Sequence, residues 1–279
     1  MPARQDEIKQ EIHSLFPQIK TSFRVESIQF KMRVAAISVK GQPLVLVRTQ
    51  ITNQASESQT AHFYYSIRPY NPEGISLIRT LEFVDQHIWR VNGQHAAILL
   101  EAPNRTYCSD LRDGDVSLTF REPRSNNQIV CSTGMATGLA EYRLDLKPQQ
   151  TSHFTALLTL SGENQLAPGS LLSNFNYPAV KHQFRKEWQA RLSQGATLQF
   201  PKRKLNDSFQ ANKMYLHVFD RGLTMTPGAL TYSACWIRDS AFMIHALDKL
   251  GFHDQAREKL LHLLSRQDKD GYFVSQEGE

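Results

Sequence analysis

A chain of 279 residues, 41% hydrophobic and 21% charged, can bury the cores of two ordinary globular domains, which excludes a disordered or fibrous protein. The net charge of +5 arises from 32 basic and 27 acidic residues spread along the chain, so it gives no indication of nucleic-acid binding. The densest basic run, at 202–204, is short and predicts a solvated turn.

Cysteine usage and the N-terminal sequence bear on the compartment. Cys108, Cys131 and Cys235 form no pattern typical of a disulfide framework or a zinc site, so we expect reduced thiols, no metal and no cofactor. The first residues lack the apolar core of a signal peptide, and no later run reaches the length of a membrane span. These features predict a cytoplasmic protein with no membrane partner, provided that Met1 is the natural start.

The elements follow in chain order. An amphipathic pattern over 6–16 predicts a short helix, and residues 1–16 are assigned to it. The sequence then changes to short segments rich in Val, Ile, Thr, Tyr and Phe, separated by turn residues, which is typical of an antiparallel sandwich or barrel. Strands are expected at 24–39, 43–52, 61–68, 77–84, 87–91, 96–101, 116–120, 129–131, 141–146 and 153–160. The β domain is assigned to residues 17–177.

One hairpin of this domain is well specified. Asn92 and Gly93 separate the runs IWRV and QHAAILL, and this dipeptide predicts a two-residue turn with positive φ at both positions. Glycines also occur in the loop at 131–138, but no helical pattern follows them, so a phosphate-binding loop is not expected there.

From residue 178 the period becomes helical. Val180, Phe184, Trp188 and Leu192 recur every four residues, and Gly195 ends the pattern. Three further helices are expected, beginning near residues 205, 241 and 256 and ending near 222, 251 and 267. The layout is a β domain, a helical linker and the opening of a helical domain.

The stretch TPGALTYSACWIRD at 226–239 places Tyr232, Trp236, Arg238 and Asp239 at a loop-to-helix junction. Carboxylate and guanidinium groups can bind pairs of sugar hydroxyls, and aromatic rings stack on the apolar faces of sugars. The same residue types also fit a purely structural role, in which Asp239 or Ser240 caps the helix at 241–250. Residue types and spacing leave both interpretations open.

A family resemblance favours the first interpretation. TYSACWIRDSAFMIHALDKLG resembles the start of the catalytic domain in glucoamylase-like glycoside hydrolases of the family-15 type, whose pattern Y-x-x-x-W-x-R-D lines the pocket for the terminal glucose. Pro227-Gly228, QDKDGYF and the RPYNPEG at 68–74 are also similar to bacterial members. The resemblance implies a β + α multidomain chain: an N-terminal antiparallel β-sandwich followed by the first helices of an incomplete (α/α)6 barrel, the six-hairpin glycosidase architecture. Residues 178–222 would be a helical linker with the first barrel-associated helix, and 223–279 the truncated start of the catalytic domain.

The resemblance also implies roles. Arg238 and Asp239 would hydrogen-bond the non-reducing-end sugar, Tyr232 would lie near its anomeric centre, and Trp236 would support the pocket wall. Asp239, ion-paired with a neighbouring Arg, is expected to stay ionised and so to bind rather than donate a proton. Inverting hydrolysis needs two carboxyl groups about 6.5–9.5 Å apart. In the family both are glutamates from later barrel loops, and Glu277 and Glu279 match neither.

The implied protein is therefore an exo-acting, inverting α-glucosidase of the glucoamylase or glycogen-debranching type. It would act on α-glucans or gluco-oligosaccharides, and this chain would be an N-terminal fragment without catalytic residues and inactive alone. Two alternatives remain open: a complete, non-catalytic carbohydrate-binding protein, and a phosphorylase or trehalose-acting enzyme of the same architecture. An incomplete barrel would expose an apolar face on its helical hairpin, so aggregation would favour the fragment.

Other candidates are weaker. The run at 268–271 echoes part of a calcium loop, but the full set of oxygen ligands is missing and a turn is favoured. His245 and His253 have no second ligand at metal spacing and are expected to be packing or surface residues. Ser240 lacks the GxSxG context of a nucleophile.

Overall fold

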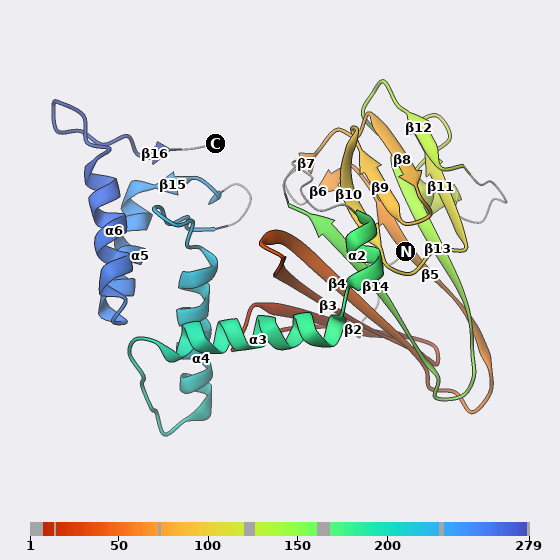
Figure 1. The fold of residues 1–279 in the computed structure, drawn as a ribbon, viewed down its shortest axis with the longest axis horizontal. Helices are drawn as coiled ribbons and strands as arrows, with labels where there is room; N and C mark the ends of the chain where they lie inside the picture. Colours follow the sequence, from red (N-terminus) through yellow and green to blue (C-terminus); the bar gives the residue numbers. More distant parts are fainter. Residues whose placement is uncertain are drawn as a thin grey trace. The chain divides into compact units, whose positions relative to one another are not determined.

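The computed structural model describes residues 8–13, 15–71, 74–119, 126–160, 168–228 and 232–277. The chain forms two compact units, a strand unit of residues 1–12 and 18–180 and a helical unit of residues 13–17 and 181–279 (Figure 1). None of the described helices is both long and apolar enough to cross a lipid bilayer.

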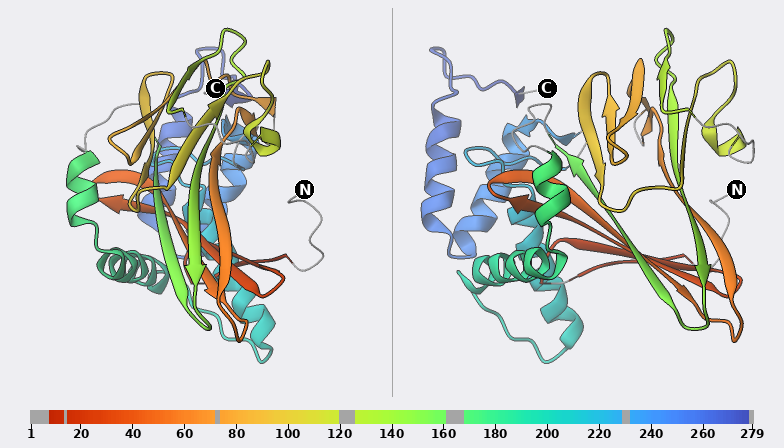
Figure 2. Two further views of the ribbon diagram at one scale, coloured as in Figure 1. Left: turned by 90° about the vertical axis from the view of Figure 1, so that its right-hand side faces the viewer. Right: turned by 45° about the vertical axis from the view of Figure 1, so that its right-hand side comes forward.

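The strand unit contains a nine-stranded antiparallel sheet. Its spatial order is β1 (Lys9–Ile12), β2 (Gln18–Val25), β3 (Ile28–Val39), β4 (Gln42–Asn53), β14 (Thr151–Thr159), β10 (Gln94–Leu99), β9 (Ile88–Val91), β8 (Thr80–Val84) and β12 (Gln128–Val130). A second sheet has the order β11 (Arg105–Ser109), β13 (Thr137–Leu146) and β5 (Gln59–Ile67). The short strands β6 (Tyr70–Asn71) and β7 (Gly74–Ile75) pair with each other, and the helices α1 (Val116–Thr119) and α2 (Pro168–Asn174) complete the unit. The large sheet is strongly twisted (Figure 2).

The core of the strand unit lies between these two sheets. Alternate residues of facing strands turn inward, and the most buried of them include Ile51, Leu81, Trp89, Leu99 and Leu146. Gly138 on β13 lets Trp89 approach the backbone, because a Cβ at this position would lie 2.5 Å from Leu81 Cδ2 and 3.0 Å from Trp89 Cη2. The expected antiparallel sandwich is confirmed.

The turn predicted from the Asn-Gly dipeptide is confirmed. Asn92 and Gly93 have φ values of 51° and 79°, and β9 pairs with β10 through Val91 and Gln94, as the hairpin prediction requires. The segment expected as one strand at 24–39 is instead interrupted by a turn with Glu26 at φ 51°, so that Val25 and Ile28 face each other across β2 and β3.

Two other predicted elements are of the wrong type. Within the segment expected to be a helix, residues 9–12 form β1, which pairs antiparallel with β2 from Lys9↔Ser22 to Ile12↔Ile19. Pairing with the edge of a large sheet outweighs the local helical pattern; residues 1–7 and 14 lie outside the described part. The strand expected at 116–120 is the short helix α1, where Asp115 Oδ1 accepts a hydrogen bond from the Ser117 amide (2.8 Å). Residue 120 is outside the described part.

The helical unit is built from α3 (Tyr177–Ser193), which begins within the strand unit, followed by α4 (Arg203–Val218), α5 (Ile237–Lys249) and α6 (His253–Leu264). All four expected helices are present. A small core joins α5 and α6 to the segment before them, with Met225, Cys235, Leu247, Phe252 and Leu263 among its buried members. The two-residue strands β15 (Cys235–Trp236) and β16 (Gln276–Glu277) pair with each other.

Two lysines are buried in this unit. Lys213 is 1% exposed, and its Nζ donates to the carbonyls of Leu192 (2.9 Å), Gln194 and Ala196 (3.2 Å) at the end of α3. Lys259 is 3% exposed and forms an ion pair with Asp220 Oδ1 at 2.9 Å. Because the last carbonyls of a helix have no intrahelical partners, Lys213 stabilises the end of α3 and holds α4 against it.

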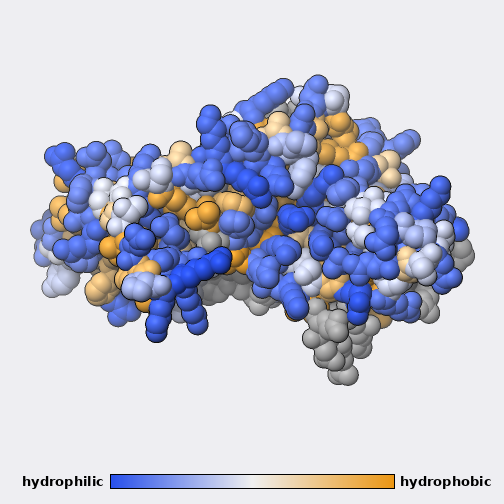
Figure 3. All heavy atoms as spheres, turned by 90° about the horizontal axis from the view of Figure 1, so that it is seen from below, coloured by the Kyte–Doolittle hydropathy of each residue, from blue (hydrophilic) through white to orange (hydrophobic). Residues whose placement is uncertain are grey.

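The side of α6 that faces away from the core of the helical unit carries exposed apolar groups. Leu260, Leu261 and Leu264 are each at least half exposed, whereas Ala256 and Leu263 on the other side are buried. Figure 3 shows one face of the molecule, on which patches of hydrophobic residues lie among hydrophilic residues.

Candidate functional site

The site predicted from the sequence lies where α5 begins. The helix starts at Ile237, and its N-cap residue is Trp236 in an extended conformation, three residues before Asp239 and four before Ser240. No side chain caps this end. The amide of Ile237 instead donates to the Ser275 carbonyl (3.1 Å), which follows from the pairing of β15 with β16. The prediction that Asp239 or Ser240 is the N-cap is wrong, because a two-stranded pairing provides the first acceptor.

Ser240 has a different structural role. Its side chain is fully buried, its Oγ donates to the Met225 carbonyl (2.7 Å), and it lies 3.3 Å from Cys235 Sγ. These contacts tie the first turn of α5 to the segment that precedes the site. Ser240 therefore fixes the position of the helix start and does not face solvent.

The two aromatic residues lie next to each other. The ring centroids of Tyr232 and Trp236 are 5.9 Å apart with an interplanar angle of 40°, and Tyr232 is 58% exposed. The Tyr232 carbonyl accepts a hydrogen bond from the Gly228 amide (3.2 Å), and residues 229–231 lie outside the described part. The Nε1 of Trp236 is buried and has no hydrogen-bond partner among the described residues. An indole N–H without a hydrogen-bond partner is costly to bury.

The charged pair occupies the first turn of α5. Asp239 is the third residue of the helix and is partly buried, while Arg238 is exposed. A carboxylate in this turn is stabilised by the helix dipole. Among the described residues, no ion pair joins Arg238 and Asp239, although one was expected. Consecutive side chains on a helix point in different directions, which keeps the two groups apart. Both groups are thus available to a ligand.

Sequence reasoning missed one exposed aromatic residue beside this turn. Phe242 is 71% exposed and follows Arg238 by four residues, so the two lie on the same side of α5. A large apolar side chain at an otherwise polar helix position was the available signal. Tyr272 and Val274, in the segment that leads into β16, are also exposed.

The remaining sequence candidates have local structural roles. The Asp268 carboxylate accepts hydrogen bonds from the amides of Asp270 (2.9 Å) and Tyr272 (2.8 Å), and Gly271 has φ 87°, so this segment is the expected turn. His253 Nδ1 lies 2.6 Å from Asp248 Oδ1, and this contact lowers the pKa of the Asp248 carboxyl. His245 is exposed on α5. Glu277 belongs to β16, and Glu279 lies outside the described residues.

Electrostatic perturbation in this unit lies away from the site. Burial lowers the pKa of His217 to about 4, with Arg191 adding to the effect, and the ring packs edge-on against Phe252 at 4.7 Å. Burial also lowers the pKa of Lys213. Both groups are packed within the unit and serve its structure. The arrangement at α5 provides a carboxylate, a guanidinium, an indole N–H and two aromatic rings, a set suited to binding a polyhydroxylated ligand.

Comparisons with known proteins identify the architecture. No protein-family model matches the chain, and no sequence match is found among curated proteins. In structure it is similar to a bacterial glucoamylase complexed with acarbose, with a TM-score of 0.69 at 11% identity, covering 96% of this chain and 43% of that one. It is also similar to a protein described as a kojibiose phosphorylase from the human microbiome, with a TM-score of 0.55 at 9% identity, covering 94% of this chain and 37% of that one. The chain has a glucoamylase-like fold, a β-sandwich followed by helices, and it spans less than half the length of either of these proteins.

Proposed function

We propose that the chain contributes the sugar-binding wall of an exo-acting, inverting α-glucosidase of the glucoamylase or glycogen-debranching type, acting on α-glucans or gluco-oligosaccharides. The observation that carries the proposal is the gathering of Tyr232, Trp236, Arg238 and Asp239 around one helix start, in a fold similar to that of a glucoamylase complexed with acarbose. The chain is proposed to act inside the cell.

In this proposal each group has a distinct task. Asp239 accepts hydrogen bonds from a pair of sugar hydroxyls and Arg238 donates to their oxygens, which together orient the ring. Tyr232 contacts the sugar near its anomeric carbon. Trp236 forms the wall behind it, and its buried Nε1 donates to an incoming hydroxyl or to a bound water. Apolar C–H groups of the sugar pack against the exposed aromatic surface.

The acid and base of hydrolysis are not assigned to residues of this chain. Asp239, as a charged binding group, stabilises the sugar and does not protonate the leaving oxygen. We therefore propose that the isolated 279-residue chain binds sugar without turnover.

A phosphorylase is the second candidate, and the similarity to the protein described as a kojibiose phosphorylase favours it. Both reactions need the same binding contacts to the terminal glucose. They differ in the nucleophile, which is water in hydrolysis and phosphate in phosphorolysis. The glucoamylase type is preferred because the structural similarity to the glucoamylase is greater. A trehalose-acting enzyme or a non-catalytic carbohydrate-binding protein would share the wall.

Titration of glucose and maltose into the chain, followed by tryptophan fluorescence, tests the proposal. Binding is expected, and it should weaken at least about tenfold in Arg238→Gln, because a guanidinium hydrogen bond to a ligand contributes more than a neutral one. Prolonged incubation with maltose should release no glucose. Affinity that is unchanged in the variant, or glucose release by the wild-type chain, would refute the assignment.

A further inference from the structure

The face of β1–β4 that points away from the sandwich core carries several cations over part of its length, whereas Ala35, Ile37, Leu44 and Leu46, further along the same face, are buried. Ile28 on β3 and Ile51 on β4 belong to the core, so the alternation of side chains places Lys31 and Arg33 on the opposite face. The register extends this face to β1 and β2. All of its residues belong to the strand unit, whereas the sugar-binding wall at α5 belongs to the helical unit.

One cross-strand row on this face brings like charges together. Arg33 lies directly opposite Lys20 on β2 and directly opposite Arg48 on β4. Side chains in such positions have Cβ atoms only about 4.5–5.5 Å apart, and like charges there destabilise a sheet. A row of three cations is therefore unfavourable for folding alone, and an anion bound above it would relieve the repulsion.

The outer cations of the row are neutralised within the protein, but the central one is not. Lys20 Nζ lies 3.1 Å from Glu11 Oε2, and Arg48 lies 3.6 Å from Glu101 and over the ring of Tyr177. Across the described ranges, neither Arg33 nor its neighbour Lys31 has an ion pair or side-chain hydrogen bond. Their donors are free to bind a ligand.

A second row adds further cations and polar groups. Ser22 faces Lys9 on one side and Lys31 on the other, and the row continues through Gln50 to His153 on β14. Burial lowers the pKa of His153, and the charges of Arg48 and Arg33 lower it further. The contribution of these two arginines places His153 beside the cations of the first row.

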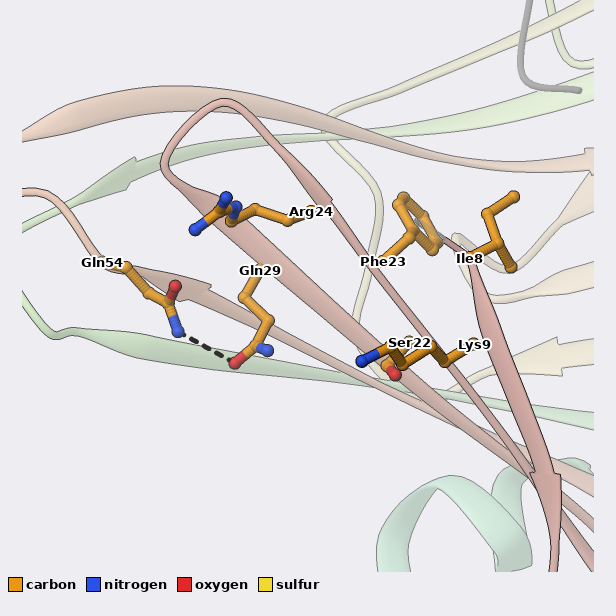
Figure 4. Close-up of a pocket in the computed structure, with 7 residues that line it drawn as sticks. All are labelled: Ile8, Lys9, Ser22, Phe23, Arg24, Gln29 and Gln54. Carbon is orange, nitrogen blue, oxygen red and sulfur yellow. Dashed lines mark hydrogen bonds between the residues drawn. The ribbon is translucent and has the colours of Figure 1, made fainter. Parts of the chain in front are cut away.

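The face ends in an open hollow of about 640 Å³ (Figure 4). Lys9, Ser22, Arg24 and Gln29 line it together with the apolar side chains of Ile8 and Phe23. Gln54, beyond β4, donates through Nε2 to Gln29 Oε1 (3.0 Å). The volume is within the range of about 300–1,000 Å³ typical of small-molecule sites. Amide, hydroxyl and cationic groups therefore meet apolar side chains in this hollow.

We propose that this outer face of β1–β4 binds a carbohydrate carrying a phosphate ester, with Lys31 and Arg33 on the phosphate and the serine and glutamine side chains on the sugar hydroxyls. Guanidinium and ammonium groups are the side chains that recognise phosphate, and amides and hydroxyls both donate to and accept from hydroxyl groups.

Binding of glucose 6-phosphate to the full chain tests the proposal, measured by calorimetry at low and at physiological salt. The matched charge-removal variants are Lys31→Gln/Arg33→Gln on the proposed face and Arg143→Gln/Lys147→Gln elsewhere in the strand unit. Glucose 6-phosphate should bind more tightly than either glucose or inorganic phosphate, and more weakly as salt is raised. The first double variant should lose at least about tenfold in affinity, whereas the second should change little.

A stability measurement separates function from folding. Because Arg33 faces two cations, Arg33→Gln should leave the melting temperature of the chain unchanged or raise it, so lost binding cannot be ascribed to unfolding. A phosphorylated amylopectin and its dephosphorylated form distinguish a polymer-borne phosphate from a free sugar phosphate. Equal affinity in the two double variants, absence of binding by both phosphate-bearing probes, or equal affinity for inorganic phosphate and glucose 6-phosphate would overturn the proposal.

Discussion

The strand unit and the helical unit satisfy their buried polar groups in different ways. In the strand unit, antiparallel pairings distribute the backbone hydrogen bonds over many strands, and buried side chains such as Asn53 add bonds to the carbonyls of Leu146 and Lys147. In the helical unit, two buried lysines reach carbonyl groups at chain reversals. Stability is thus spread widely in one unit and concentrated on a few side chains in the other.

The largest expected effect follows from that concentration. Lys213→Met keeps much of the side chain's volume but leaves three carbonyls near the end of α3 without their donor, and we expect a loss of about 3 kcal/mol. Hydrogen exchange should show faster opening of α3 and α4 while amides of β4 and β14 keep their protection. Lys204→Met, an exposed position on the same helix, is the control. Equal protection in both variants would contradict the role given to Lys213.

In the strand unit the sharpest single-residue effect is expected from overpacking. Gly138→Ala places a methyl group against Leu81 and Trp89, and it should lower the stability of this unit by about 1–3 kcal/mol. Gly169→Ala, where a Cβ meets open space, serves as the matched substitution. If both variants unfold at the same denaturant concentration as the wild type, the sandwich core is packed less tightly than described.

The units should also differ in their response to acid. The pKa of His217 is about 4 in the folded chain and 6.5 without burial, so between these pH values the unfolded state binds more protons. Stability of the helical unit should therefore fall as the pH is lowered from about 6.5 to about 4. His217→Phe keeps a ring against Phe252 and should reduce this pH dependence, as followed by exchange of α4 amides. An identical pH dependence in the variant would argue against the buried neutral imidazole.

The smallest effect on stability is expected at the exposed side of α6. Leu261→Gln/Leu264→Gln should change the free energy of unfolding by about 0.5 kcal/mol or less, because both side chains already contact solvent. The same variant should reduce self-association in sedimentation experiments, since it removes exposed apolar surface. Leu118→Gln on the strand unit, where the side chain is even more exposed, should not reduce it. Self-association that is unaffected by the double variant would remove α6 as its source.

The sequence predicts well the elements with a regular hydrophobic period and the turns marked by specific turn residues. The Asn92-Gly93 hairpin, the sandwich class and all four long helices follow from local patterns. The pattern fails where distant pairing decides the outcome. β1 is a strand because β2 offers an edge, and the true start of α5 is set by β16, some forty residues later. Such contacts leave no periodic signal in either segment.

The candidate site shows the same limit. Residue types and spacing bring Tyr232, Trp236, Arg238 and Asp239 to one junction, and the structure places them at the start of α5. The cap, by contrast, depends on Ser275, and the burial of Ser240 depends on Met225. The basic rows of the large sheet could not be recognised from the sequence either, because the register that aligns Lys20, Arg33 and Arg48 is a property of three strands together.

The central claim, that the start of α5 binds sugar through Asp239, is tested most directly by calorimetric titration of maltose into three proteins. These are the wild-type chain, Asp239→Ala, and Asp254→Ala, which removes the corresponding carboxylate from the first turn of α6. The account predicts that Asp239→Ala binds at least about tenfold more weakly, while Asp254→Ala retains wild-type affinity. Equal affinities in all three proteins would contradict it.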